Sequence, residues 1–425
     1  MIQIYQYGEV SDEEIFARTL PTARVEGTVS EIIATVKREG DKALFDYTAR
    51  FDGAHLSSLA VTKAEIDDAL RQVEPRFLSI LEKAAANIRR FHEKQVRTSF
   101  IMNEEDGIIT GQKITPVDRA GLYVPGGTAA YPSTVLMDAI PAKIAGVAEV
   151  CMVTPPSSDG TVNPVILAAA HVAGIDRIFK VGGAQAIAAL AYGTESIPRV
   201  DKIVGPGNAY VAEAKRQVYG EVSIDMVAGP SEILIVADGA SSARHLAADL
   251  LSQAEHDKNA SAVLVTDSRE LAEAVQAELE RQIPLLPRQE IARASIDTNG
   301  KIIVAQSLLD AIEVSNRLAP EHLELCVEHP FDLLDKVKHA GSVFMGRYCP
   351  EALGDYLAGP NHTLPTGGSA RFASPLSVDD FVKKTQYTYY TKAALSRVAE
   401  DVAFFAEKEG LSAHARSALA RTQED

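Results

Sequence analysis

Short apolar runs that alternate with alanine-rich helical stretches constrain the fold of this chain more than any other feature of its sequence. From about residue 120 onward, Gly and Pro bound these runs, and the stretches between them carry apolar residues at helical spacing. Strands that alternate with helices favour a parallel sheet covered by helices. The first series of predicted strands is Gly121–Val124, Val150–Val153, Ile178–Val181 and Lys202–Val204.

A second series follows at Ile233–Val236, Ala262–Val265, Ile302–Val304 and Ser342–Phe344. Residues 31–48 and 64–95 are rich in helix formers, and beyond about residue 374 the strand signals fade into a polar helical tail. The sequence therefore predicts an α/β fold with two similar, incomplete Rossmann-like parallel-sheet units, a helical N-terminal segment and a helical C-terminal tail. Because the tail lacks a core of its own, we expect it to pack on something else, with a second subunit as one candidate.

The size and charge of the chain limit its organisation and its partners. Its 425 residues exceed the roughly 250 to 300 at which a single core stops growing, so we expect at least two packed units. The net charge of −16 repels nucleic-acid phosphates and anionic membranes, and we expect neither partner. The sequence shows no signal peptide and no run approaching about 20 apolar residues, which predicts a cytoplasmic protein. None of the three cysteines lies in a CxxC motif, so we expect them to be structural.

Three polar segments contain candidate metal ligands. Gln253 and His256 stand three residues apart, so on a helix they share a face from which both could reach one metal ion, although such a pair is more often solvated or capping. Asp355 offers a hard oxygen ligand just before a loop dense in Gly and Pro, and His362 lies within that loop; an ordinary surface loop is the alternative. His414 stands in the tail, where a lone histidine is more often solvent-exposed.

Glu321 and His322 place a carboxylate beside an imidazole. Two such groups can divide proton transfers between them when their environments separate their pKa values. The same residues are equally typical of a helix start, with Pro320 at the first position and Glu321 favoured by the helix dipole. Spacing alone does not decide between these two interpretations.

Three glycine-rich loops follow predicted strands, although the usual GxGxxG dinucleotide fingerprint is missing. Ligands of open α/β sheets bind at the carboxyl ends of the strands, where these loops would lie. The loops therefore favour a ligand cleft over chance turns, without identifying its ligand. They run from Tyr123 to Gly127, from Val181 to Gln185 and from Val204 to Asn208.

Together these segments closely resemble the histidinol dehydrogenase family of histidine biosynthesis. The resemblance covers essentially the whole chain in the family's order and spacing, through Arg119–Gly127, Gly205–Asn208, Gly229–Glu232, Gln253–His256, Ala319–Leu323 and Gly359–His362. It implies oxidation of L-histidinol to L-histidine through L-histidinal, with two NAD reduced. It also implies an N-terminal helical arm (1–25), a discontinuous first α/β domain (26–122 and 233–376), a second α/β domain that binds NAD (123–232) and a C-terminal dimerisation tail (377–425).

The resemblance further implies roles for single residues. One zinc ion would be held by Gln253, His256 and Asp355 of one subunit and by His414 of its neighbour, in a homodimer with shared active sites. Such a nitrogen and oxygen ligand set suits an open site that admits substrate. His322 would be the base for both hydride transfers, and Glu321 would activate water. The other residues that the resemblance places at the substrate are Ser231, His362 and Glu409, and those that it places at NAD are Tyr123, Gln185 and Asn208.

Three alternatives stay open at this point. A relative with the same zinc and NAD machinery could act on another alcohol, although His362 and Glu409 are groups able to meet the polar ends of histidinol. A non-catalytic zinc- or nucleotide-binding protein would not need the Glu321 and His322 pair. Aldehyde oxidation through a cysteine thiohemiacetal requires an accessible thiolate, whereas Cys151 lies in an apolar run that we expect to be buried, as we expect for Cys326.

Overall fold

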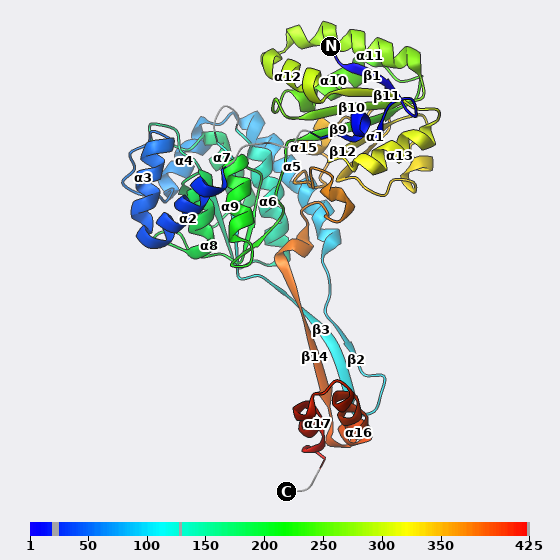
Figure 1. Cartoon of the computed structure of the whole chain (residues 1–425). Coiled ribbons are helices and arrows are strands. Elements are labelled where there is room, and N and C mark those ends of the chain that lie inside the picture. The colour runs from blue at the N-terminus through cyan, green and yellow to red at the C-terminus, as the bar shows by residue number, and fades with distance from the viewer. Residues whose placement is uncertain (19–24, 127–129, 423–425) are drawn as a thin grey trace. The chain divides into compact units, whose positions relative to one another are not determined.

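The computed structural model describes residues 1–18, 25–126 and 130–422, and it divides into two compact units (Figure 1). Unit 1 comprises Met1–Gln95 and Asp118–Phe381, and unit 2 comprises Val96–Val117 and Val382–Asp425. Unit 1 contains two parallel sheets, and unit 2 contains an antiparallel one. The predicted α/β class with two parallel-sheet units is confirmed.

The first sheet of unit 1 has six parallel strands, and its core is built by the two faces of its central strands. Successive side chains of a strand point to opposite faces. In β9, Ile233 and Ile235 therefore pack with α10 (Ala243–Ala254), α11 (Arg269–Gln282) and α12 (Gln289–Asn299), while Leu234 and Val236 pack with α13 (Leu308–Leu318). The strand order is β1 (Gln3–Gln6), β11 (Lys301–Val304), β10 (Ser261–Thr266), β9 (Glu232–Ala237), β12 (His322–Cys326) and β13 (Ser342–Met345).

The second sheet of unit 1 has five parallel strands, in the order β6 (Arg177–Lys180), β5 (Glu149–Thr154), β4 (Arg119–Tyr123), β7 (Lys202–Val204) and β8 (Ser223–Ile224). One face shares a hydrophobic core with α2 (Glu26–Glu39), α3 (Asp41–Phe51), α8 (Gly183–Tyr192) and α9 (Ala209–Val218). On the other face, α6 (Pro132–Ala145) contacts β4 and β5 and packs on α7 (Pro164–Ala173).

Helices α2 and α3 pack differently from the grouping expected above, which joined residues 26–122 to residues 233–376. The apolar stripe of α2, with Val29, Ile32 and Val36 buried, shares a core with the five-stranded sheet. Helices α4 (Lys63–Gln72) and α5 (Pro75–His92) contact α7 and α6 of the same sheet layer. The four helices therefore pack with the five-stranded sheet and the helices that flank it, and not with the six-stranded sheet as that grouping implied.

Strands also occur near both chain ends, where the sequence analysis expected helices. Strand β1 pairs with β11 and precedes the short helix α1 (Asp12–Phe16). In the tail, β14 (Val382–Tyr390) pairs with β3 (Ile108–Pro116), which pairs with β2 (Phe100–Met102). Thr and Tyr, which favour strands, fill β14 in place of an apolar run. The rest of unit 2 is helical, as predicted, in α16 (Lys392–Lys408) and α17 (Ser412–Leu419).

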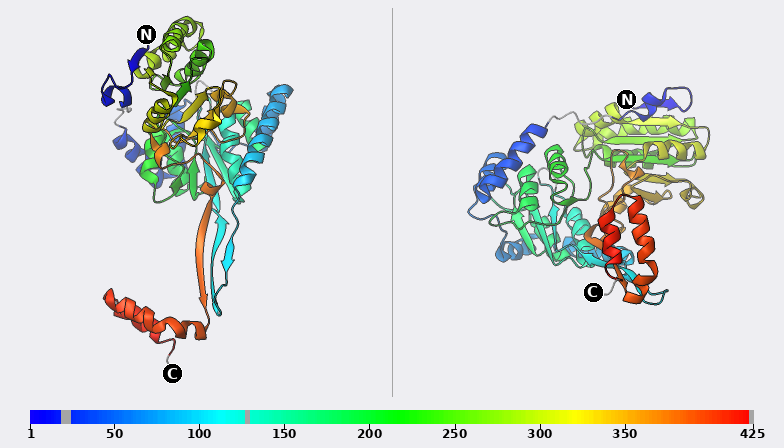
Figure 2. Two further views of the ribbon diagram at one scale, coloured as in Figure 1. Left: turned by 90° about the vertical axis from the view of Figure 1, so that its right-hand side faces the viewer. Right: turned by 60° about the horizontal axis from the view of Figure 1, so that its bottom comes forward.

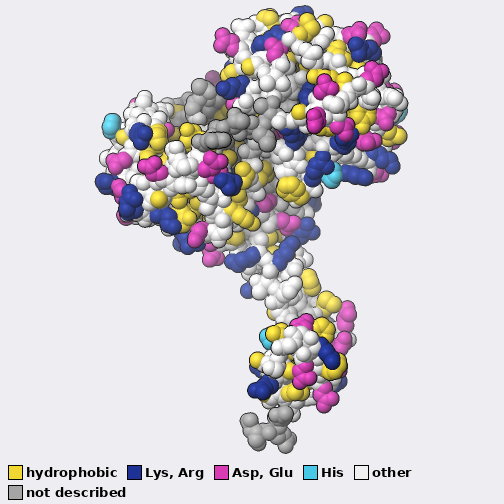
Figure 3. Space-filling model, in the orientation of Figure 1, with side chains coloured by type: hydrophobic (Ala, Val, Ile, Leu, Met, Phe, Trp, Pro, Cys, Tyr) yellow, Lys and Arg dark blue, Asp and Glu magenta, His cyan; other side chains and the backbone are white. Residues whose placement is uncertain are grey.

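The two helices of unit 2 pack side by side around a small cluster of Ala403, Ala406, Ala415 and Leu419 (Figure 2). Large apolar side chains remain exposed on them, among the yellow atoms of Figure 3. Phe404 is 63% exposed and Phe405 is 67% exposed. So small a cluster, beside exposed aromatic rings, is typical of a surface that packs against a further protein surface.

Helices α14 (Phe331–Leu334) and α15 (Glu351–Tyr356) are the remaining α-helices described in unit 1. Within the described parts of the chain, none of the helices combines the length and the apolar character needed to cross a bilayer.

Candidate functional site

A cluster of buried polar residues lies at the amino end of the six-stranded sheet. Glu321 and His322 stand at the start of β12, and Ser231 and Glu232 stand at the start of the neighbouring β9, with His322 paired opposite Ile233. The interpretation of Glu321 as a helix start is therefore wrong, because α13 ends before it and a strand follows. The chain turns between the two at Ala319, whose φ of 48° is in the left-handed region.

The backbone carbonyl of Glu232 fixes the tautomer of His322. Nδ1 of His322 lies 2.9 Å from this oxygen. Because a carbonyl can only accept, Nδ1 carries the hydrogen, and Nε2 keeps its lone pair. Nε2 has no hydrogen-bond partner among the described residues and lies 3.7 Å from Oε1 of Glu351. Burial lowers the pKa of His322 to about 4, so the ring is a neutral proton acceptor at pH 7.

Glu321 is held by the backbone of the same residue, Glu232. Its Oε2 accepts a hydrogen bond of 2.9 Å from the backbone N–H of Glu232 and lies 3.7 Å from Nδ1 of His322. Burial, together with the carboxylates of Glu232, Asp355 and Glu351, raises the pKa of Glu321 well above its ordinary value. The Glu232 side chain is paired with Arg18 at 3.4 Å. The environments of Glu321 and His322 thus separate their proton affinities, as acid/base chemistry requires.

Asp355 and His362 form an ion pair next to His322. Nδ1 of His362 lies 3.2 Å from Oδ1 of Asp355. Burial opposes the charge on Asp355, but the hydrogen bond from His362 and the nearby His322 and His256 outweigh it and lower its pKa to about 2. Asp355 is therefore an ionised oxygen donor, and one ligand atom each of His322, Glu351 and Asp355 lie within 4.8 Å of one another.

Gln253 lies in the last turn of α10, is 1% exposed, and belongs to the same region. Its amide is close enough to Glu351 to lower the pKa of that carboxyl. Neither its amide oxygen nor its amide nitrogen, however, has a hydrogen-bond partner among the described residues. A buried amide without a partner costs free energy unless something else binds it. The amide of Gln253 and the carboxylate of Asp355 fit a metal ion such as zinc, which takes nitrogen and oxygen ligands.

The structure thus brings together Glu321, His322, Asp355 and His362, with Gln253 and His256 acting on the pKa values of their neighbours. Glu409 and His414 are exposed residues of unit 2. The sequence analysis missed Arg18, Glu232 and Glu351. Glu232 ends the segment Gly229–Glu232 that carries the resemblance, and Glu351 precedes Asp355 by four residues, so that on α15 the two share a face. Arg18 carried no such signal.

Two of the cysteines are unsuited to nucleophilic attack on an aldehyde because they are buried. Cys151 and Cys326 are buried, as predicted. Burial, and then the charge of Glu149, raise the pKa of Cys151 to about 12. A thiol of this kind stays protonated at neutral pH and is a poor nucleophile.

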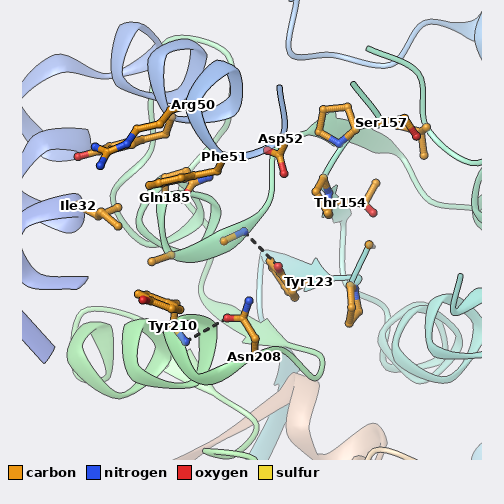
Figure 4. Close-up of a pocket in the computed structure, with 18 of the residues that line it drawn as sticks. Ile32, Arg50, Phe51, Asp52, Tyr123, Thr154, Ser157, Gln185, Asn208 and Tyr210 are labelled. Carbon is orange, nitrogen blue, oxygen red and sulfur yellow. Dashed lines mark hydrogen bonds between the residues drawn. The ribbon is translucent and has the colours of Figure 1, made fainter. Parts of the chain in front are cut away.

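A second feature is a cavity of about 920 Å³ beside the five-stranded sheet (Figure 4). Its walls include Tyr123, Gln185 and Asn208, which the sequence analysis placed at a nucleotide. All three lie at the carboxyl ends of β4, β6 and β7, as expected for an open α/β sheet. Gly127, in the first of the glycine-rich loops, lies outside the described residues.

Two helices point their amino ends at this cavity. The backbone N–H of Gly183, at the start of α8, donates to the Tyr123 hydroxyl at 3.1 Å. The side-chain oxygen of Asn208 caps α9 by accepting from the N–H groups of Tyr210 and Val211. Helix amino ends carry a partial positive charge and favour anions such as a pyrophosphate.

Comparison with known proteins identifies the family to which this arrangement belongs. A family model described as histidinol dehydrogenase matches residues 17–422. The chain belongs to the histidinol dehydrogenase family. It is 55% identical over 406 residues to the histidinol dehydrogenase of Syntrophotalea carbinolica (95% of this chain, 94% of the relative). It is 57% identical over 401 residues to that of Bacillus cereus (94% and 93%).

A crystal structure of histidinol dehydrogenase from Elizabethkingia anophelis matches with a TM-score of 0.95 and 39% identity, and the match covers 99% of this chain and 98% of that one. The matches therefore extend over both units of the chain. Membership confirms the predicted oxidoreductase class and its place in histidine biosynthesis.

Proposed function

We propose that this chain oxidises L-histidinol to L-histidine through L-histidinal at one zinc-dependent site and reduces two NAD. The observation that carries the proposal is the buried, neutral His322, whose Nδ1–H is engaged by Glu232 and whose Nε2 is without a partner among the described residues. A general base needs this arrangement, with one nitrogen held and the other free to accept a proton.

Gln253, His256 and Asp355 would hold the zinc ion together with His414 of the partner subunit. The unsatisfied amide of Gln253 and the ionised carboxylate of Asp355 support this set. A bound zinc ion would orient the substrate and polarise its oxygen, since zinc has no redox chemistry of its own. Ser231, His362 and Glu409 would contact the polar groups of histidinol.

The chain's own residues would move the protons. His322 accepts the alcohol proton on Nε2 while the carbon loses a hydride to the nicotinamide, which yields histidinal. Glu321 takes a proton from water, and the resulting hydroxide adds to the aldehyde carbon. His322 releases the first proton to solvent and then accepts a second one from the aldehyde hydrate as the second hydride leaves, which yields the carboxylate. The raised pKa of Glu321 supports its part, because a stronger base activates water more readily.

NAD would bind in the cavity at the five-stranded sheet. The amino ends of α8 and α9 would receive its pyrophosphate, and Tyr123, Gln185 and Asn208 would line its path. This assignment agrees with the position of the cavity at the carboxyl ends of the strands.

The test is the anaerobic stoichiometry of metal-analysed protein. We expect two NADH for each histidinol consumed and loss of this yield after chelation. A yield of one NADH, or full activity without metal, would contradict the proposal.

The shared site of the proposed homodimer has its own test. Gln253→Ala and His414→Ala chains, each inactive alone, are unfolded together and refolded as a mixture. If each site uses His414 of the partner subunit, half of the dimers are mixed and each has one intact site, so we expect about a quarter of the wild-type activity. A mixture as inactive as its components would contradict sharing.

A further inference from the structure

Asp52 is a half-buried carboxylate in the wall of the 920 Å³ cavity, and the chemistry proposed above gives it no role. It ends helix α3, where its backbone N–H donates to Thr48 at 3.0 Å. Its Oδ2 is buried and has no hydrogen-bond partner among the described residues. Burial raises the pKa of Asp52 to about 6, so the group is ionised at pH 7 while its buried Oδ2 has no donor among the described residues. A carboxylate in this state is poised to accept hydrogen bonds from a ligand.

The topology of the sheet explains why a carboxylate that binds the ribose of a dinucleotide would have to come from outside the sheet. The order β6-β5-β4-β7-β8 is that of a dinucleotide-binding sheet with β4 as its first strand and β5 as its second. In such sheets an acidic residue after the second strand binds the ribose hydroxyls of NAD. Here β5 ends in Thr154, and the cavity residues that follow it, Pro155 to Ser158, include no acid.

The surroundings of Asp52 suit the adenosine half of a dinucleotide. Ile32, Tyr47 and Phe51 line the cavity, and the rings of Tyr47 and Phe51 are stacked with centroids 5.5 Å apart. Figure 4 shows Ile32 and Phe51 on the same side of the cavity. These groups offer an apolar and aromatic surface for an adenine ring. In Figure 4, Asp52 lies beside Tyr123, whose hydroxyl accepts from the amino end of α8, and Asn208 at the amino end of α9 lies beyond Tyr123.

The charges of the cavity disfavour an additional phosphate. Among its described lining residues, the charged ones are Glu31, Arg50 and Asp52. Arg50 is exposed, with its guanidinium 5.3 Å from the centre of the Phe51 ring. A phosphate on the ribose would meet the Asp52 carboxylate, and both would be negative.

We propose that Asp52 determines the cofactor specificity of this site: its carboxylate accepts hydrogen bonds from the adenosine ribose hydroxyls and so selects NAD over NADP. The inference rests on the proposed function, since it assumes that the cavity binds NAD. Asp52 touches the cofactor away from the reacting atoms, so its loss should affect binding more than chemistry.

The experiment measures binding of NAD, NADP and ADP-ribose to the zinc-loaded full-length protein by calorimetry. Asp52→Asn keeps the shape and removes the charge, and Asp46→Asn is the matched control, because Asp46 is an exposed acid of the same helix outside the cavity lining. We expect Asp52→Asn to weaken the binding of NAD and ADP-ribose about 10- to 100-fold and to reduce the preference for NAD over NADP at least about tenfold. Asp46→Asn should match the wild type.

Two results would overturn the inference. If NAD binds wild type and Asp52→Asn within about threefold of each other, Asp52 does not bind the ribose, although the dinucleotide site stands. If neither NAD nor ADP-ribose binds the wild-type protein, the proposed site itself fails, and the inference fails with it.

Discussion

Replacement of His322 by Asn separates the two roles that its position permits. His322 could act as a base, or it could ligate a metal, since its ring lies with Glu351 and Asp355 in one possible ligand group. The proposed function makes it the base and assigns the metal to Gln253, His256 and Asp355. An asparagine amide can still donate to the carbonyl of Glu232, so the variant should fold, while no proton acceptor replaces Nε2.

The magnitude follows from the chemistry that is lost. A positioned general base contributes about 10²- to 10⁴-fold to a rate, which corresponds to about 2.7 to 5.4 kcal/mol of barrier. His322 is 4% exposed, so water has little access to take its place. We therefore expect kcat for NADH formation from histidinol to fall about 10²- to 10⁴-fold, with one zinc ion per chain retained.

The assay combines NADH absorbance at saturating substrate with metal analysis of the same preparation. His171→Asn, a change at an exposed histidine of α7, serves as the control and should leave both values as in the wild type. A kcat within about threefold of the wild type would refute the base assignment, because it lies far below the contribution of a general base. Loss of zinc from the variant would instead make His322 a ligand.

Three further changes test other parts of the account. Cys151→Ser should keep both oxidation steps, since burial raises the pKa of this thiol to about 12; loss of the histidinal step alone, measured with added histidinal, would overturn the water-based mechanism. Burial and a neighbouring carboxylate raise the pKa of Glu324 to about 8. The contribution of protonated Glu324 to the free energy of unfolding is therefore fully present below its unfolded pKa of about 4.5, and it is lost as the pH rises to about 8. In thermal unfolding, the free energy of unfolding of Glu324→Gln should therefore exceed that of the wild type by about 2–4 kcal/mol at pH 8 and by little at pH 5. The exposed control Glu328→Gln should show no such gain, and a pH-independent difference for Glu324→Gln would contradict this reasoning. Gly205 has a φ of 114°, and an added methyl group would overlap the backbone of β4. Gly205→Ala should therefore lower the free energy of unfolding in urea by at least about 2 kcal/mol. The loss should be larger than for Gly174→Ala, where φ is 73° and the space is open; equal losses would show that the close approach is unimportant.

The sequence predicted those parts of the fold in which a local pattern decides the structure. Eight strands of the two parallel sheets were predicted because strands buried on both faces are continuous apolar runs. Strand β12 was not predicted, because its two leucines alternate with His322, Glu324 and Cys326. A glutamate within a sequence is typical of a solvated position, although Glu324 is buried. Strand β14 escaped for a related reason, since its exposed Thr, Tyr and Lys carry no apolar periodicity.

The candidate site could be predicted residue by residue only through resemblance. Each local segment has an ordinary interpretation, and the contacts that give the groups their chemistry join residues far apart in the chain, such as Arg18 with Glu232. Asp52 shows the limit most clearly. It lies in the cavity wall because α3 packs on the five-stranded sheet, and no pattern around residue 52 indicates that packing.

The location of the proposed acid/base pair, Glu321 and His322, has a physical reason in the strand register. Ligands of parallel sheets commonly lie at the carboxyl ends of the strands, and the cavity of the five-stranded sheet follows this rule. In the six-stranded sheet, Glu321 and His322 lie instead at the amino ends of the strands. There β9 and β12 begin side by side, so the peptide of Glu232 offers its N–H to Glu321 and its carbonyl to His322. One backbone residue thereby fixes both the orientation of the carboxylate and the tautomer of the imidazole. A slip of one residue in this pairing would turn His322 to the opposite face, so the hydrophobic residues that hold the register of β9 and β12 also determine which nitrogen is free to accept a proton.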